Sequence, residues 1–357
     1  MRRPPLLLFL TAAILACLGA CRPQQKAAYY ELTGYAQGGT YSVKLRTDGC
    51  DRTPGQLKTG IDSLLTLIDT TLSGYNPASQ LSRFNAGETI RPNELFLDMY
   101  DRAYSFWLLS GGVLDFAAGP LFDAWGFGFR EGGTLPTDAE IAALLASSGM
   151  KRLVSAIRPA VREDGTLSPA DLLREPGGPL PRLNYNAIAQ GLSCDIVAAW
   201  LRERGCEDFL VNIGEIYCQG LNPSGQGWSI GVDRPFDGND TPGEDIQGVW
   251  NSDGRACGIV TSGNYRKFFI DENGEKYVHT IDPRSGYPVR SRLLSATVTA
   301  PDAATADALA TWCMVIGKEA SETLIASLGD ACSCYLIYDE DGEMLASPSP
   351  GFHLIRN

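Results

Sequence analysis

A carboxylate and a hydroxyl stand four residues apart in the stretch Ala304-Thr305-Ala306-Asp307-Ala308-Leu309-Ala310-Thr311, which has the pattern of the first turns of a helix. Side chains at that spacing lie on one helical face. Asp307 and Thr311 would therefore offer two hard oxygen donors to a cation such as Mg²⁺. We expect Asp307 to be partly exposed in a cleft. A surface aspartate beside a helix-interior threonine would give the same spacing, so the metal site depends on other segments.

The first of these segments contains one of only two histidines in the chain, which are His279 and His353. Two histidines exclude a His-rich zinc site. His279 lies at the end of an expected strand, where Pro283 and Gly286 force a turn. His279 and Asp282 could project from the strand end into a cleft, which suits proton transfer. A surface histidine next to an ordinary Asp-Pro turn is the alternative.

A second segment, Thr261-Ser262-Gly263, follows another expected strand. Its hydroxyls and its glycine permit the close approach of backbone N–H groups to a phosphate, and Arg266 is near in sequence. An ordinary loop would explain the segment as well.

Two other positions suit a ligand with a flat ring and a charged group. Asn184 precedes a helix, where it is either an ordinary N-cap or, with the backbone around Ala187, part of a binding site at the positive helix end. Tyr75 is an aromatic residue in a loop, suited to stacking on a ring or to anchoring the loop on the surface. Residues 112–128 form a turn system rich in glycine and aromatic residues, which packing alone could explain.

Composition limits the class of protein. The chain has 357 residues, of which 44% are hydrophobic and 20% charged, so it can bury a large core as one large domain or two small ones. Its net charge of −12 argues against nucleic acid as a partner. An acidic protein that binds a diphosphate needs a metal ion or backbone N–H groups to offset the repulsion.

The N-terminus has the pattern of a targeting segment. Arg2 and Arg3 precede an apolar run over residues 6–18, and Leu18-Gly19-Ala20-Cys21 resembles a bacterial lipobox. Cys21 would then be lipidated and become the mature N-terminus. A signal peptide cut nearby, or lipidation at Cys17, is the alternative. Elsewhere the sequence has no apolar stretch long enough to cross a membrane.

This pattern divides the chain into three parts. We expect a signal peptide over residues 1–20, a tether over 21–30 and one domain over 31–357. The eight cysteines of the mature chain include no Cys-x-x-Cys pair, which argues against a zinc ribbon. Export would permit disulfides, but their pairing cannot be deduced from the sequence.

Hydrophobic periodicity predicts helices alternating with hairpins. The expected helices cover 57–72, 92–109, 137–146, 188–204 and a segment starting near 304. The expected strands cover 41–45, 209–213, 228–232, 258–261, 267–270, 276–281, 294–299, 335–338, 343–346 and 352–355. Residues 154–181 are expected to be irregular. The fold class is therefore α+β, with largely antiparallel sheets flanked by helices. No Gly-x-Gly-x-x-Gly unit supports a Rossmann dinucleotide site.

Eight motifs, in this order over residues 36 to 317, together resemble the ApbE family of FAD:protein FMN transferases. They are Gly38-Gly39-Thr40-Tyr41, Ser79-Gln80-Leu81-Ser82-Arg83-Phe84-Asn85, Asp115 with Gly119-Pro120-Leu121, Asn184-Tyr185-Asn186-Ala187-Ile188-Ala189-Gln190-Gly191, Val211-Asn212-Ile213-Gly214-Glu215-Ile216, Thr261-Ser262-Gly263-Asn264-Tyr265, His279-Thr280-Ile281-Asp282-Pro283-Arg284-Ser285-Gly286 and Ala306-Asp307-Ala308-Leu309-Ala310-Thr311.

The resemblance implies an exported, Mg²⁺-dependent enzyme that splits the diphosphate of FAD, attaches FMN to a Thr or Ser of a partner protein and releases AMP. Asp307 and Thr311 would bind Mg²⁺ through their side chains, and Ala187 and Ala304 through their carbonyls. His279 would accept the proton, with Asp282 as a second candidate. The residues implied to line the FAD pocket are Gln37, Tyr75, Val113, Leu114, Asp115, Asn184, Gln190, Thr261, Ser262, Gly263 and His279.

The chain departs from the family pattern at three of these positions. The family often has Met at the position of Gln37, Asp at that of Asn184, and Lys or Glu near Gln190. Without a carboxylate at Asn184, a hydrogen bond to a ring of FAD would weaken. Asp307 and Thr311 keep the family pattern, which favours a working metal site.

The resemblance also implies a partner and a location. The acceptor would be a redox-pump subunit or another exported flavoprotein with a Ser/Thr flavinylation motif. The enzyme would be lipid-anchored in the bacterial cell envelope, on the periplasmic side of the inner membrane. Two alternatives remain open, a Mg²⁺-dependent FAD diphosphatase and a lipoprotein that binds flavin without turning it over.

Overall fold

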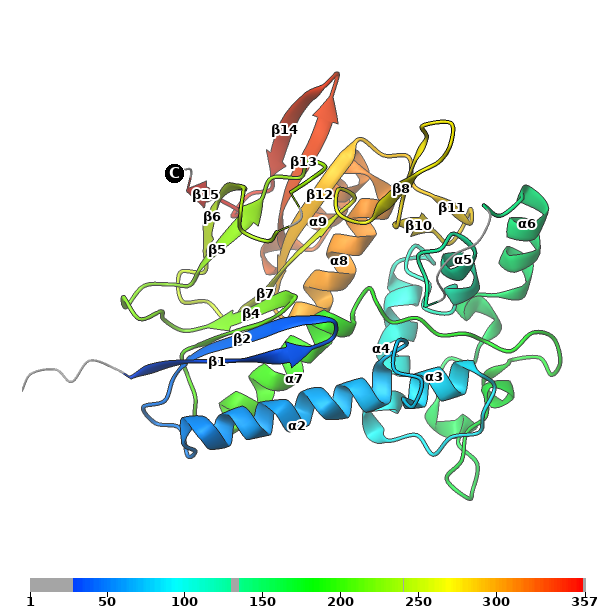
Figure 1. Ribbon diagram of the computed structural model, residues 1–357, viewed down its shortest axis with the longest axis horizontal. Coiled ribbons are helices and arrows are strands. Elements are labelled where there is room, and N and C mark those ends of the chain that lie inside the picture. Colours follow the sequence, from blue (N-terminus) through cyan, green and yellow to red (C-terminus); the bar gives the residue numbers. More distant parts are fainter. Residues whose placement is uncertain (1–27, 130–134, 240, 356–357) are drawn as a thin grey trace, which may run out of the picture.

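An eight-stranded antiparallel sheet forms the framework of the computed structural model, which describes residues 28–129, 135–239 and 241–355 (Figure 1). Its strand order is β1-β2-β3-β4-β7-β12-β13-β14. These strands are β1 Tyr29–Ala36, β2 Gly39–Arg46, β3 Phe209–Ile213, β4 Glu215–Gln219, β7 Cys257–Gly263, β12 Leu293–Ala300, β13 Ser333–Glu340 and β14 Glu343–Pro348. The predicted α+β class with antiparallel sheets is confirmed.

Eight α-helices accompany this sheet in the described residues. The helices are α2 Pro54–Leu72, α3 Gln80–Asn85, α4 Glu94–Leu109, α5 Gly119–Ala124, α6 Asp138–Ser147, α7 Ala189–Glu203, α8 Ala303–Ile316 and α9 Lys318–Ser327. Four of them, α2, α7, α8 and α9, pack on one of the faces of the sheet. Helix α8 packs on β7 and β12 and contacts α7 and α9, so it lies near the middle of the layer. The expected helices agree with α2, α4, α6, α7 and α8 within a few residues.

A three-stranded sheet covers part of the other face. Its order is β15-β6-β5, with β5 Ser229–Asp233, β6 Ile246–Asn251 and β15 Leu354–Ile355. Alternation along β7 separates the two faces: Ile259 packs in the cluster under the small sheet, and Val260 packs in the cluster under α8. Strands β1, β4 and β6 were not among the expected elements, nor was the short strand Tyr287–Pro288.

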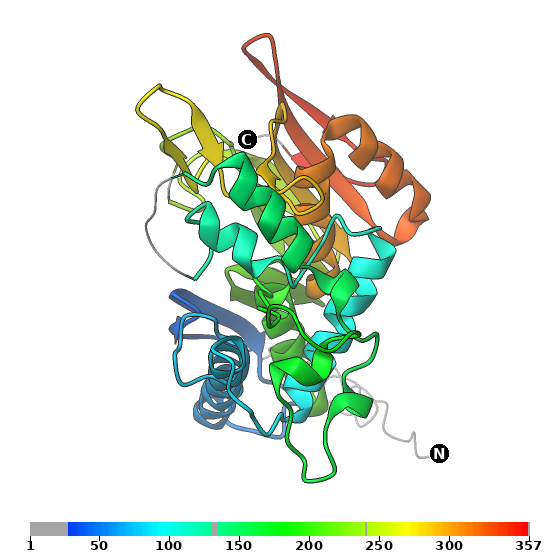
Figure 2. The same cartoon turned by 90° about the vertical axis from the view of Figure 1, so that its right-hand side faces the viewer.

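Two short hairpins connect the sheet to the helical region. Strand β8 Phe268–Ile270 pairs with β9 Lys276–Val278, and β10 Ile281–Asp282 pairs with β11 Tyr287–Pro288. Helices α5 and α6 lie beside β10–β11, as Figures 1 and 2 show. Trp125 fixes this contact, because its indole N–H donates to the carbonyl of Gly286 at 2.8 Å. Residues 154–181 contain only short 3₁₀ turns and isolated bridges, as expected of an irregular insertion.

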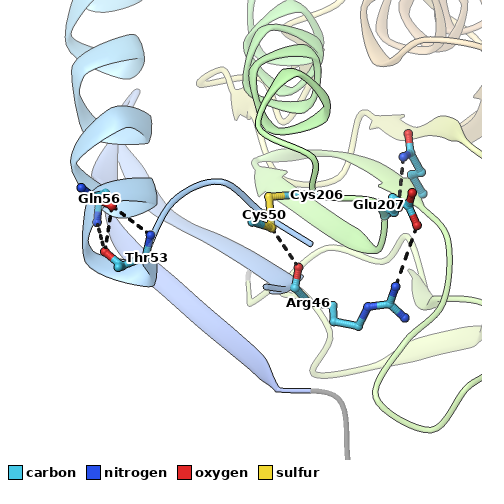
Figure 3. The surroundings of a disulfide bond; sticks show 7 residues. Arg46, Cys50, Thr53, Gln56, Cys206 and Glu207 are labelled. Carbon is cyan, nitrogen blue, oxygen red and sulfur yellow. Dashed lines mark hydrogen bonds and ion pairs between the residues drawn. A yellow bond between two sulfur atoms is a disulfide. The ribbon is translucent and has the colours of Figure 1, made fainter. Parts of the chain in front are cut away.

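A disulfide joins two loops that are distant in sequence. It links Cys50, after β2, to Cys206, after α7 (Figure 3). Nearby, Thr53 and Gln56 form a capping box that starts α2. The other six cysteines of the described residues are buried and form no disulfide there.

The start of the domain differs from the prediction. Strand β1 begins at Tyr29, which pairs with Arg46 of β2, so Tyr29 and Tyr30 belong to the sheet and not to the tether. The tether prediction was wrong for these two residues because the ladder with β2 extends to its end. The signal peptide, most of the tether and Cys21 lie outside the described residues. Among the described residues, no helix is long and apolar enough to span a membrane.

Candidate active site

A cavity of about 670 Å³ lies where α8 meets β4, β7 and the turn system that precedes α5. Most of the predicted site residues line it. They are Tyr75, Val113, Leu114, Asp115, Asn184, Ala187, Gln190, Thr261, Ser262, Gly263, His279, Asp307 and Thr311. These residues come from six stretches of sequence, between residue 75 and residue 311, that meet in one place.

Asp307 and Thr311 lie on the face of α8 that borders the cavity. Asp307 is only 5% exposed, which corrects the expectation of a partly exposed residue. The reason is the close packing of α7: the Gly191 N–H donates to Oδ2 of Asp307 at 3.1 Å. Burial raises the pKa of Asp307 to about 7. The hydroxyl of Thr311 lies 3.5 Å from that of Ser262.

Two carboxylates fix the start of α8. Asp302 accepts a hydrogen bond from the Thr305 N–H at 2.8 Å, as an N-cap does. Asp195 reaches over from α7 and accepts from the N–H groups of Ala303 and Ala304, at 2.7 and 2.9 Å. Burial raises the pKa of Asp195 to about 6. Together they hold the helix that carries Asp307.

Close approach of α7 and α8 requires a glycine at position 191. A Cβ atom there would lie 2.3 Å from the carbonyl oxygen of Ala303. Any side chain at this position would therefore push the helices apart and withdraw the N–H that Asp307 accepts.

Glu215 also lines the cavity, and sequence reasoning gave it no role. It is the first residue of β4 and follows Gly214, whose φ of 92° requires glycine. Burial raises the pKa of Glu215 well above its usual value, the charge of Asp307 raises it further, and the Thr261 N–H acts in the opposite direction as a donor. The sequence feature that could have identified Glu215 is a carboxylate directly after the glycine that follows strand β3.

His279 lies on the cavity wall, half-buried, beyond the end of β9. Its Nδ1 lies 3.0 Å from the carbonyl oxygen of Lys267. Hydrogen bonding there requires Nδ1 to donate, so Nε2 is the acceptor of the neutral ring. Burial lowers the pKa of His279 to about 4, and the ring is therefore neutral at pH 7.

Aromatic side chains surround the opening of the cavity. Tyr75 is 67% exposed and stands edge-on to Phe129, with 5.0 Å between the ring centroids. The ring of Phe127 stacks on that of Phe269 at 5.4 Å and stands edge-on to His279 at 6.4 Å. A flat ring system could contact these side chains.

Asn184 and Asp115 shape the cavity wall through their own hydrogen bonds. The side-chain carbonyl oxygen of Asn184 accepts a hydrogen bond from the Asn186 N–H at 3.0 Å. Asp115 accepts from the N–H groups of Ala117 and Met150, each at 2.9 Å. These bonds fix the backbone turns before α5 and α7.

Three predicted site residues do not line the cavity. Gln37 lies in the β1–β2 turn, where its side-chain amide donates to the Ser193 hydroxyl. Ala304 is fully buried in the first turn of α8, where Asp195 holds its N–H. These two were placed by resemblance alone. In the structure the Gln37 side chain bonds to Ser193, and Ala304 is buried outside the cavity lining.

Asp282, the third, forms an ion pair with Arg284. The guanidinium donates to both of its carboxylate oxygens, at 2.9 and 2.8 Å. Burial acts to raise the pKa of Asp282, but the hydrogen bonds from Arg284 outweigh it and lower that pKa. A carboxylate held in this way is a poor proton acceptor, so the ion pair with Arg284 argues against the predicted catalytic role of Asp282.

The donor atoms around Asp307 suit a hard cation. They are the carboxylates of Asp307 and Glu215, the hydroxyl of Thr311 and the backbone at Ala187. No group of three or more His, Cys, Asp or Glu side chains suited to a metal occurs in residues 28–129, 135–239 and 241–355. All the donors are oxygens, which fits Mg²⁺ and not zinc.

The fold and the site define an α+β protein whose cavity has carboxylate and hydroxyl oxygens around Asp307 and opens between aromatic side chains. The sequence profile of the ApbE family matches residues 37–336. The chain belongs to the ApbE family, which confirms the resemblance found in the sequence.

Similar proteins and solved structures support this family assignment. FAD:protein FMN transferase from Haemophilus influenzae is 30% identical over 96% of this chain and 95% of that protein. Its counterpart from Vibrio cholerae is 33% identical over 86% of each. The structure of the flavin transferase ApbE from Vibrio cholerae has a TM-score of 0.74 at 31% identity, covering 91% of this chain and 98% of that one. Flavinyl transferase ApbE from Pseudomonas stutzeri, in its apo form, has a TM-score of 0.76 at 27% identity, covering 92% and 96%.

Proposed function

We propose that this protein transfers FMN from FAD to a Ser or Thr hydroxyl of an acceptor protein, with Mg²⁺ as cofactor and AMP as the second product. One observation carries the proposal: a single cavity has Asp307 and Thr311 on one side and a neutral histidine on another. The names of the relatives support the same reaction.

Different parts of the cavity would bind the cation, the phosphates and the flavin ring. Asp307 and Thr311, with the backbone of Ala187, would hold Mg²⁺, which when bound would neutralise the diphosphate oxygens. Backbone groups at Thr261 to Gly263 can approach the phosphates closely, because Gly263 has no side chain. Tyr75 at the opening would contact the flavin ring.

His279 would accept the proton of the incoming hydroxyl through Nε2. The acceptor oxygen bonds to the FMN phosphorus as the bond from that phosphorus to the bridging oxygen breaks, and AMP leaves. Transfer of this kind depends on positioning and on charge neutralisation. The lowered pKa of His279 keeps Nε2 free to accept at pH 7.

Incubating the protein with FAD, Mg²⁺ and candidate acceptors tests the proposal. We expect flavin fluorescence on the acceptor band of a denaturing gel, and none when a chelator removes the metal. FMN and AMP without a labelled acceptor would indicate a diphosphatase. Intact FAD in every reaction would indicate a flavin-binding protein without activity.

We further propose that Cys21 is lipidated and anchors the enzyme on the periplasmic side of a bacterial membrane, where an exported redox-pump subunit is the acceptor. The sequence Leu18-Gly19-Ala20-Cys21 supports this. Membrane fractionation of the wild type and of Cys21→Ser tests it. We expect only the variant to appear in the soluble fraction, and equal partition would contradict the anchor.

A further inference from the structure

Two carboxylates from different elements border the same part of the cavity. Asp307 comes from α8 and Glu215 from β4, and α8 packs directly on β4. Asp307 accepts one hydrogen bond from a backbone N–H, that of Gly191 at 3.1 Å, which leaves further lone pairs on its carboxylate for another partner. The charge of Asp307 raises the pKa of Glu215, so the two carboxylates are close enough to interact.

The nearby guanidinium groups are engaged with other acids. Arg266 lines the cavity but donates to Asp233 at 2.6 Å. Arg284 pairs with Asp282 at 2.8 Å. Asp307 is buried and Glu215 half-buried, and no ion pair among the described residues joins either of them to Arg266 or Lys267, the two cationic residues that line the cavity. Neighbouring carboxylates repel each other, and a bound divalent cation is the usual compensation.

We propose that Glu215 is a further anionic ligand of the divalent cation held by Asp307 and Thr311. This inference rests on the cation site of the proposed function. A second carboxylate raises the negative charge of the site, which strengthens the binding of a hard cation. Because β4 and α8 are both fixed by the main sheet, the site is formed before any nucleotide arrives.

Glu215→Gln is the decisive variant. Glutamine has nearly the same shape as glutamate, but it carries no charge. If Glu215 only supports the strand as a neutral side chain, this change leaves cation binding as it was. Glu343→Gln is the matched control, because Glu343 is an exposed glutamate on the edge strand β14.

The experiment titrates the nucleotide-free protein with Mn²⁺ and follows free Mn²⁺ by electron paramagnetic resonance, so that it needs no turnover. We expect Glu215→Gln to weaken binding about 10- to 100-fold, Glu215→Asp to weaken it less, and Glu343→Gln to match the wild type. The rise in Tm that Mn²⁺ causes should shrink in Glu215→Gln, which also shows that the variant folds.

Asp307→Asn separates the two claims. If it abolishes Mn²⁺ binding while Glu215→Gln binds like the wild type, the inference is wrong and the cation site stands. If Asp307→Asn binds normally, or if the wild type binds no Mn²⁺ at millimolar concentration, both are wrong. FMN transfer to an acceptor is measured separately and decides the proposed function.

Discussion

The floor of the cavity, which carries Asp307 and Glu215, and its opening, which carries Tyr75 and His279, are built in different ways. Asp307 and Glu215 lie on α8 and β4, elements of the main layers, and the Gly191 N–H holds the carboxylate of Asp307. Tyr75 and His279 lie in loops or next to strands of two or three residues, and Tyr75 is largely exposed.

This difference matches what each part must do. A diphosphate and its cation demand fixed donors, because small displacements weaken coordination and slow transfer. An acceptor protein must bring its own hydroxyl to the opening, which calls for accessible side chains. We therefore expect changes on the floor to affect cation binding and changes at the opening to affect the rate.

The largest effect should come from Asp307→Asn. Asparagine fills the same space and can accept from the Gly191 N–H, but it removes a charged ligand of the cation. We expect FMN transfer to fall on the order of 10³-fold or more, with circular dichroism unchanged. FMN transfer by Asp307→Asn at the wild-type rate would show that transfer does not depend on a cation bound by Asp307.

A second effect should appear at the opening with His279→Ala. Loss of a general base slows proton transfer about 10²-fold or more, whereas FAD contacts the floor and the walls as before. We expect the rate constant to fall and the Kd for FAD to stay within about threefold. His353→Ala is the control, since His353 is the other histidine and is exposed. A weaker Kd with an unchanged rate would make His279 a binding residue.

The titration of His279 sharpens the contrast. We expect its imidazole NMR signal, assigned with His279→Asn, to titrate near pH 4, well below 6.5. Because the folded pKa lies below the unfolded one, His279 contributes stability that is complete above pH 6.5 and is lost as the pH falls towards 4. A titration midpoint above pH 6 would show that water surrounds the His279 ring, and it would contradict the effect of burial on this pKa.

The smallest effect should come from Asp195→Ala, behind the floor. It removes the carboxylate that accepts from the first N–H groups of α8, and loss of such a cap costs about 1–2 kcal/mol of unfolding free energy. Urea denaturation measures it, with exposed Asp330→Ala as the control. Unchanged stability would mean that Asp302 alone fixes the helix start.

The sequence predicted the parts of the site that depend on local spacing. Asp307 and Thr311 share a face because they lie four residues apart in one helix, and no tertiary contact is needed to see it. The long amphipathic helix α2 was found for the same reason. The family resemblance supplied most of the remaining wall of the cavity.

Positions that depend on packing between distant elements were missed or misplaced. Glu215 enters the cavity only because β4 lies beside β7 and under α8, which no local pattern predicts. Asp282 was given a proton role because its bidentate pairing with Arg284 could not be seen. The burial of Asp307 likewise depends on how closely α7 approaches.

The intact mass of an acceptor protein after incubation with FAD and Mg²⁺ tests the central claim most directly. The account predicts an increase equal to one FMN less one water, on a Ser or Thr, with wild-type enzyme and none with Asp307→Asn. An acceptor that keeps its original mass while FAD is consumed, or that gains FMN equally with Asp307→Asn, would contradict it.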